Sequence, residues 1–576
     1  MRRSDSALVL ALVAVLAIVA VLVSVPALVP AATAEPTDPP IAPVVDRPYR
    51  EGVLGHPVSI SPLTARTQAD RDLVALIFAG LVRNGPDGTL VPDLAARWTV
   101  SDDGRSWTFE LRPDARWHDG QAVTAEDVVF TVRTLQDPDY TGPRASSWVG
   151  VSVRATGVRT VTFTLETPLG GFLQAATQPI APAHLLADVP VASLPDDPFG
   201  EQPVGSGRFA LESLESDLAV LRPPPAPTDG ESGAPPTPGA TDALSTRPPT
   251  ARPDVPRPYL DGIEFHYYSD SEALAADYAA GRLDAASGVD PAVAAGLAAA
   301  PDSRLLRYPG STLTAVIFNL RPDHRAFSTP DVRTGLLAAI DGEALISEAF
   351  QDAATEADSL IPPSSPWFDA TVDAAVAHDV AAAAAALEKA GWTKPDGAWR
   401  LPGAKADLRI ELLSPERTSN AAVHAAAAAV ARDWSAFGLD VEHVALPAGE
   451  FVSDRLAEGD YDVAVVDLAI GLDPDLYPLL ASTQTLTGGS NVMGLQDAAL
   501  DALLVAARKP GPDDARAAAY AALQAQLAKG RYVLPMAFAD ETVVVHEALQ
   551  GPEIHQVSDP SDRFWDVLTW RLADDR

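Results

Sequence analysis

Hydrophobic and polar positions change their period along the chain, and these changes predict a succession of strands and helices. Residues 98–100 and 107–111 alternate on either side of a Ser-Asp-Asp-Gly turn, which predicts a β-hairpin. The apolar residues of 70–82 recur at helical spacing, and the Asn-Gly-Pro-Asp-Gly stretch at 84–88 ends that pattern. Thr124 to Asp127 has the order of a capping box, with Asp in the usual Glu position, so we expect a helix to begin there.

Beyond residue 310, predicted strands and helices alternate. Short apolar stretches predict strands at 313–319, 408–413, 441–446 and 461–467. The longer periodic runs predict helices at 331–350, 372–390, 420–437 and 497–507. Alternation of this kind is typical of a mixed α/β lobe.

The chain has 576 residues, of which 47% are hydrophobic, so it can build a sizeable core in more than one domain. Its formal net charge is −36, from 42 basic and 78 acidic residues. Nucleic acids and anionic membrane surfaces attract an excess of Lys and Arg, so we expect neither as a partner. The chain contains no cysteine, which excludes disulfides, thiolate metal sites and lipid attachment through a cysteine.

The N-terminal segment has the pattern of an export signal. Arg2 and Arg3 precede an apolar run over 7–29, and Ala-Ala-Thr-Ala follows at 31–34. The run is also about 20 residues long, enough to cross a bilayer as an uncleaved anchor. Both interpretations of 1–34 stay open, and both place the body of the protein outside the cytoplasm, either membrane-associated or secreted.

Two other segments lack any apolar period. Residues 35–48 are rich in proline and are expected to form a linker. Residues 222–258 are dense in Pro, Gly, Ser and Thr, which predicts a flexible surface insertion.

Several sequence blocks follow one another in an order that resembles a known family. They are Leu76-Ile77-Phe78-Ala79-Gly80-Leu81, Val91-Pro92-Asp93-Leu94-Ala95, Trp98 to Glu110, Trp117 to Val128, Pro203-Val204-Gly205-Ser206-Gly207, Phe318-Asn319, Val332-Arg333, Ala338-Ala339-Ile340-Asp341, Ala390-Gly391-Trp392, Asp473-Pro474-Asp475 and Gly488-Gly489-Ser490-Asn491. The chain thereby resembles the ABC-transporter solute-binding proteins of the peptide- and nickel-binding family, the family 5 extracellular solute-binding proteins. The resemblance runs from about residue 50 to the C-terminus.

This resemblance implies an α/β fold of the two-lobed periplasmic-binding-protein type, type II in its large three-subdomain variety, with a hinge and a central cleft. Lobe I would comprise 49–314 plus 537–576, with the insertion 222–258 inside it, and lobe II would comprise 315–536. The implied function is reversible binding of a small, peptide-like solute. The implied partners are the ligand and an ABC permease and ATPase complex in the membrane, and we expect a monomer that needs no cofactor.

The resemblance also suggests where a ligand would be held. The candidate contacts are Trp148, Asp467, Ile470, Gly488 and Asn491. In peptide-binding relatives, a Trp and then, three residues later, an Asp that grips the ligand's amino group follow the strand here at 461–466. Asp467 and Ile470 occupy those two positions, so the amino-group clamp is missing from its usual place. Asp467 could replace it from a shifted position, or its side chain could face away.

We expect no catalytic residue and no metal site. Trp117-His118-Asp119-Gly120 precedes a capped helix and is interpreted as a turn, because no nucleophile accompanies it. The ten histidines are scattered without metal-binding spacing. Two other classes stay open: a membrane-tethered sensor with the same fold, and an envelope hydrolase, which is disfavoured by the lack of a Gly-x-Ser-x-Gly motif.

Overall fold

The structure is a computed structural model that describes residues 47–85, 89–142, 148–224, 260–372, 374–406, 408–485 and 489–573. The predicted export segment 1–34, almost all of the linker 35–48 and most of the insertion 222–258 lie outside these residues. In the part of the chain that is described, no helix has both the length and the hydropathy needed to cross a membrane.

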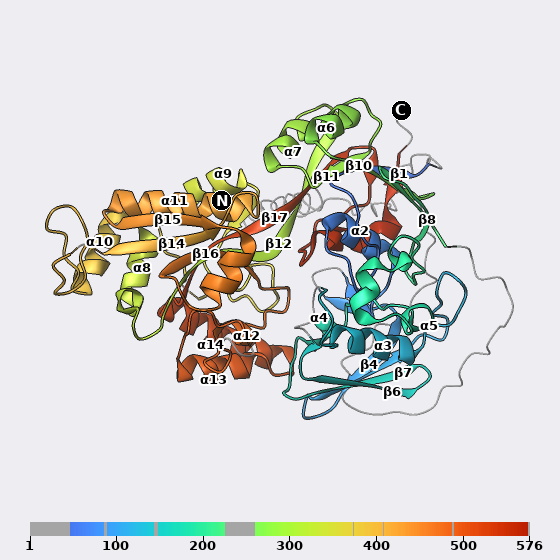
Figure 1. Ribbon diagram of the computed structural model, residues 1–576, viewed down its shortest axis with the longest axis horizontal. Helices are drawn as coiled ribbons and strands as arrows, with labels where there is room; N and C mark the ends of the chain where they lie inside the picture. Colours follow the sequence, from blue (N-terminus) through green and yellow to red (C-terminus); the bar gives the residue numbers. More distant parts are fainter. Residues whose placement is uncertain are drawn as a thin grey trace, which may run out of the picture. The chain divides into compact units, whose positions relative to one another are not determined.

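One large mixed sheet runs through most of the described chain, with 11 strands among the described residues (Figure 1). Its strands, in order across the sheet, are β15 (Asp440–Leu446), β14 (Arg409–Pro415), β16 (Val463–Ala469), β12 (Ser303–Phe318), β17 (Val533–His546), β11 (Ala285–Ser287), β1 (Tyr49–Leu54), β10 (Ile263–Tyr268), β9 (Leu218–Arg222) and β8 (Ala210–Leu214). The strand β13 (Ala354–Glu356) also pairs with β17.

The remaining strands form smaller sheets. A four-stranded antiparallel sheet has the order β4 (Ala95–Val100), β5 (Ser106–Leu111), β7 (Thr160–Leu165) and β6 (Val151–Gly157). Two-stranded sheets pair β2 (Val82–Asn84) with β3 (Leu90–Pro92), and β18 (Leu549–Gln550) with β19 (Arg571–Leu572).

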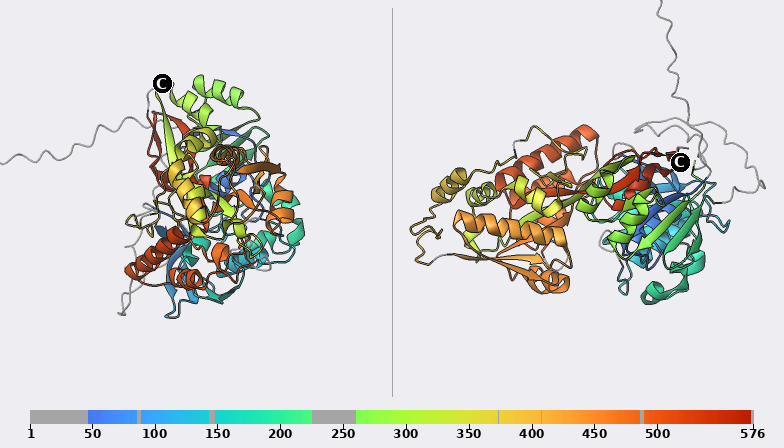
Figure 2. Two further views of the ribbon diagram at one scale, coloured as in Figure 1. Left: turned by 90° about the vertical axis from the view of Figure 1, so that its left-hand side faces the viewer. Right: turned by 90° about the horizontal axis from the view of Figure 1, so that it is seen from above.

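Helices pack on these sheets and on one another. They are α2 (Gln68–Ile77), α3 (Ala125–Leu135), α4 (Phe172–Ala175), α5 (Ala183–Leu186), α6 (Ser271–Ala279), α7 (Pro291–Ala298), α8 (Pro330–Ala338), α9 (Gly342–Phe350), α10 (Val380–Lys389), α11 (Ala421–Phe437), α12 (Tyr477–Leu480), α13 (Ala498–Ala507) and α14 (Asp513–Gly530). Figure 2 shows α11 lying along the strands β14 and β15, which it contacts. Tighter 3₁₀ turns occur at η3 (Val191–Asp196), η4 (Pro198–Gly200), η5 (Arg325–Phe327) and η7 (Pro560–Thr569), and a wider π-helical turn forms η6 (Glu450–Leu456).

Elements with a local signal form where the pattern predicts them. The hairpin β4–β5 is confirmed, and so is the cap of α3, where the Thr124 backbone N–H donates to the Asp127 carboxylate at 2.8 Å. The predicted helix at 420–437 is confirmed as α11, and Asn420 caps it by accepting from the Val423 N–H at 3.0 Å.

Three predicted helices have wrong bounds. The helix predicted at 331–350 is two helices, α8 and α9, because the Asp341 side chain accepts from the Ala344 N–H and starts a new helix. The helix predicted at 372–390 begins only at Val380, where Asp379 caps it. The helix predicted at 70–82 ends at Ile77, whose carbonyl accepts from the Gly207 N–H at 2.7 Å. In that last case a distant segment takes the hydrogen bond that a longer helix would have used.

Two long neighbouring strands, β12 and β17, run from one hydrophobic core to another. Leu306 of β12 and Val543 of β17 belong to a core built from residues 49–308 and 543–572. Farther along the same two strands, Val316 and Leu534 belong to a core within 316–537, which a further cluster within 313–538 accompanies. These clusters support the predicted lobes I and II, whose exact boundaries stay a prediction.

The pairing of β12 with β17 is interrupted between the two sets of core. The register shifts between Pro309 and Leu313, opposite residues 538–540. A Cβ on Gly310 would lie 2.1 Å from the Ala539 carbonyl oxygen, so only glycine fits in this bulge. An irregularity in both connecting strands at one level is the feature expected of a hinge.

Candidate functional site

Asp467 stands near the end of β16 as an exposed carboxylate held in a fixed position. Its Oδ1 accepts a hydrogen bond from the Thr314 hydroxyl at 2.6 Å, and its Oδ2 accepts from the Asn420 side-chain amide at 2.9 Å. Thr314 lies directly opposite on β12, and Asn420 is the residue that caps α11. Among the described residues, no cationic side chain forms an ion pair with Asp467. The carboxylate is therefore preorganised and free to meet a cation from outside.

The segment that follows Asp467 is attached to the hinge at one end and touches lobe I at the other. The Ile470 N–H donates to the carbonyl of Ser311, inside the bulge of β12, at 3.2 Å. Asp473, three residues later, lies close enough to Gly171 of lobe I that a Cβ there would be 3.2 Å from its carboxylate carbon. Residues 467–473 thus run along the boundary between the two lobes.

Glycines of lobe I allow this second contact between the lobes. The Gly170 N–H donates to the Arg508 carbonyl at 2.7 Å, and a Cβ on Gly170 would lie 3.1 Å from the Arg516 guanidinium carbon. Arg516 in turn makes a two-pronged ion pair with Asp473, with Nη2 to Oδ1 at 2.7 Å and Nη1 to Oδ2 at 3.1 Å. We call this group of contacts the clasp. It joins the lobes at a place separate from the two hinge strands.

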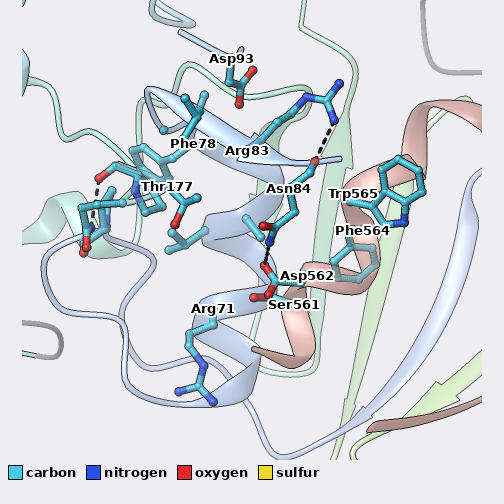
Figure 3. A pocket seen from close by; sticks show the side chains of 18 of the residues that line it. Arg71, Phe78, Arg83, Asn84, Asp93, Thr177, Ser561, Asp562, Phe564 and Trp565 are labelled. Atoms are coloured by element: carbon cyan, nitrogen blue, oxygen red, sulfur yellow. Dashed lines mark hydrogen bonds between the residues drawn. The ribbon is translucent and has the colours of Figure 1, made fainter. Parts of the chain in front are cut away.

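Lobe I also contains a polar cavity of about 180 Å³ between α2, β2, the segment 174–179 and η7 (Figure 3). Three arginines and two aspartates contribute to its wall, namely Arg71, Arg83, Arg208, Asp93 and Asp562. Arg71 is paired with Asp559 at 2.9 Å, and Asp562 accepts from the Asn84 side-chain amide at 2.8 Å.

The residues proposed from the sequence lie in different environments. Trp148 is 2% exposed and packs between Phe163 and Phe172 in the core of lobe I. Ile470 is 7% exposed and belongs to a core cluster of lobe II. Asn491 is fully buried, and its amide bonds the carbonyls of Ala481 and Leu495.

Gly488 lies outside the described residues. Of the four described candidates, Asp467 alone presents its side chain to the surroundings. Ligand contact by the five residues stays a prediction.

The cavity residues were missed because no pattern in the sequence links them. One signal was present in retrospect: Arg208 follows directly on Gly205-Ser206-Gly207, a basic residue within an otherwise small and apolar stretch. The glycines there pack on the end of α2, where a Cβ on Gly207 would lie 2.5 Å from the Leu76 carbonyl. This packing places the next side chain at the cavity, and it depends on segments about 130 residues apart.

Comparison with known proteins agrees with this architecture. The family model described as "Bacterial extracellular solute-binding proteins, family 5 Middle" matches residues 89–491. Protein XP55 of Streptomyces lividans is 29% identical over 489 residues, which cover 83% of this chain and 80% of XP55. The oligopeptide-binding protein AppA of Bacillus subtilis is 23% identical over 533 residues, which cover 91% of each chain.

Solved structures share the fold. The structure of AppA from Bacillus subtilis in complex with a nonapeptide has a TM-score of 0.67 at 21% identity, and covers 92% of this chain and 100% of that one. The structure of NikZ from Campylobacter jejuni in complex with Ni(L-His) gives the same values. The two-lobed type II fold is therefore confirmed.

The chain belongs to the bacterial extracellular solute-binding proteins of family 5. It is accordingly an extracellular solute-binding protein.

Proposed function

We propose that this protein binds a peptide-like solute at the boundary between its lobes and that Asp467 holds the solute's free amino group. The supporting observation is the state of Asp467, an exposed carboxylate fixed by Thr314 and Asn420 and without a cation of its own. A charge-assisted hydrogen bond to a carboxylate is stronger than a neutral one, so an ammonium group is the natural partner. The peptide-binding names of several relatives point to the same class of solute.

The position of Asp467 also fits a closing mechanism. A ligand that contacts both lobes shifts the population toward the closed form by its extra affinity for that form. The clasp, in which Asp473 lies beside Gly171 of lobe I, would hold the lobes together around the solute. The solute is released unchanged to the permease and ATPase complex, so no catalytic step is required of the protein.

Calorimetric titration with a panel of short peptides tests this proposal. Asp467→Asn keeps the shape and removes the charge, so we expect affinity for peptides with a free amino group to fall at least about tenfold. Peptides with an acetylated amino group should bind wild type and variant equally. Asp460→Asn, at an exposed position of the same lobe, serves as the control. Equal affinity of wild type and Asp467→Asn for free-amino peptides would contradict the assignment.

We further propose that residues 1–34 direct the protein out of the cytoplasm, as a cleaved signal or as an anchor, and that the body acts as a monomer. Mass spectrometry of the protein from its native membrane and culture-supernatant fractions would read the mature N-terminus. A start after residue 34 supports cleavage, an intact start in the membrane fraction supports an anchor, and an intact cytosolic protein contradicts both.

A further inference from the structure

We propose that the cavity in lobe I is a second binding site, which takes the carboxylate of a small solute and uses Arg208 as its anchor. All residues of its wall belong to lobe I, and none belongs to the predicted lobe II. The proposal therefore stands apart from amino-group binding at Asp467 and does not depend on it.

The cavity wall is much less acidic than the whole chain. Three arginines face two aspartates there, whereas the complete chain carries 42 basic and 78 acidic residues. Anions are attracted to a concave site of locally positive potential. Arg71 is neutralised by Asp559, so a positive charge that could attract an anion has to come from an arginine of the wall that has no acidic partner.

Arg208 is the arginine best placed to bind that anion. No aspartate or glutamate among the described residues forms an ion pair with it, whereas Arg71 is already bound to Asp559. The Nη2 atom of Arg208 is buried and has no hydrogen-bond partner among the described residues. A buried guanidinium donor without a partner is costly, and its fork of N–H groups matches a carboxylate.

Other polar atoms of the wall are unpaired as well. Trp565 Nε1 and Ser558 Oγ are further donors for a carboxylate, and both lack a partner within the described chain. The side-chain oxygens of Asn84 and Gln178 lack a donor and suit an N–H group of the same solute. This combination fits a small carboxylic acid that carries an amide.

The size and the access of the cavity agree with such a solute. Its volume of about 180 Å³ exceeds the ~150 Å³ of an engineered cavity that holds benzene. Arg208, Thr177 and Trp565 are only partly buried, so the cavity communicates with solvent. Asn84 points across it toward Asp562, and Trp565 stands at its side (Figure 3).

A matched pair of probes tests the proposal on the full chain. N-acetylglycine carries the carboxylate and the amide, and N-acetylglycinamide differs only by replacing the carboxylate with a neutral amide. Neither has a free amino group, so neither can use the ammonium contact at Asp467. We expect saturable calorimetric binding of N-acetylglycine and at least about tenfold weaker binding of N-acetylglycinamide, because the charged hydrogen bond is lost.

Arg208→Gln should weaken N-acetylglycine binding at least about tenfold, while Arg97→Gln, at an exposed pair on β4, should leave it unchanged. Circular dichroism checks that both variants are folded. If Arg208→Gln is misfolded, Arg208→Lys takes its place, and because it keeps the charge it should retain part of the affinity for N-acetylglycine. An N-acetylated tripeptide with a free C-terminus distinguishes a peptide carboxylate from a free acid; Arg208-dependent binding of either supports the site.

If neither N-acetylglycine nor the N-acetylated tripeptide shows saturable binding, the cavity holds only water and the proposal is overturned. Binding that is equal in wild type and Arg208→Gln would overturn it too. Failure of the Asp467→Asn test leaves these results unaffected, so the two proposals fail separately.

Discussion

Two groups of ion pairs, one around Arg563 and one around Arg516, differ in how deeply they are buried and in which part of the fold they lie. Arg563 of η7 is 3% exposed and contacts Glu51 at 2.8 Å and Asp72 at 2.7 Å, both almost completely buried. It joins the C-terminal segment to Glu51 of β1 and Asp72 of α2. Arg516 and Asp473 of the clasp are 10% and 21% exposed and lie where the two lobes touch.

The difference in burial indicates which ion pair stays formed during function and which one can open. Removing one partner of a fully buried pair leaves a charge without solvent, so such a group does not open during function. A partly exposed pair exchanges its partner for water at little cost and can form and break. The buried group therefore fixes lobe I. The Arg516–Asp473 pair lies within lobe II and forms the surface that Gly170 and Gly171 of lobe I contact.

The largest expected effect is on the buried group. Arg563→Met should lower the free energy of unfolding by about 3–5 kcal/mol, because Glu51 and Asp72 would face each other without a cation. Urea unfolding measures the change. Arg97→Met, in an exposed pair with Glu110, should cost at most about 1 kcal/mol. Similar losses in the two variants would show that burial does not distinguish the pairs.

The second prediction concerns Glu541, a carboxyl group near the buried ion pair, and the pH dependence of stability. Burial raises the pKa of Glu541, near Arg563, to about 7 from its ordinary value of 4.5. The folded state then keeps a proton that the unfolded chain releases, so stability falls as pH rises from about 4.5 to about 7. Glu541→Gln removes this loss and should stabilise the protein by up to about 3 kcal/mol at pH 8 and hardly at all at pH 4.

Urea unfolding of wild type and Glu541→Gln at both pH values checks this expectation. Glu547→Gln, at an exposed position just beyond β17, is the control. A difference between Glu541→Gln and wild type that is the same at pH 4 and pH 8 would show that this carboxyl does not couple folding to pH.

The smallest expected effect on stability is at the clasp. Arg516→Gln should lower the free energy of unfolding by only about 1–2 kcal/mol, since the pair with Asp473 is partly exposed. Peptide affinity should fall about three- to tenfold, mainly through faster dissociation, because the closed form becomes less populated. Stopped-flow dissociation of a bound peptide measures this. Arg432→Gln, in an exposed pair with Glu348, should change neither quantity, and unchanged dissociation in Arg516→Gln would remove the clasp from the mechanism.

Much of the fold could be predicted from short segments. The capping residues Thr124 and Asn420 act on atoms only three residues away, so their helices were found. Asp341 acts just as locally, yet the apolar run on both sides of it continued the helical period and hid the break. Family membership was equally accessible, because it depends on the order of blocks and not on their placement in space.

The candidate site was predictable only in part. Comparing residues one by one predicts Asp467 as a ligand contact and the absence of the amino-group clamp at Ile470, and the ligand contact stays a prediction. Whether Asp467 faces away was not predictable, because its orientation depends on the register that pairs it with Thr314, 153 residues earlier.

What the linear chain established was the set of local elements and the kind of protein, since capping, turns and periodicity involve neighbouring residues. Folding alone decided which charges meet. Arg563 lies 491 residues from Asp72, and the unpaired state of Arg208 follows from segments packed around α2. Electrostatic energies depend on the distance between charges and on their burial, and for charges remote in the sequence both are set only when the chain folds.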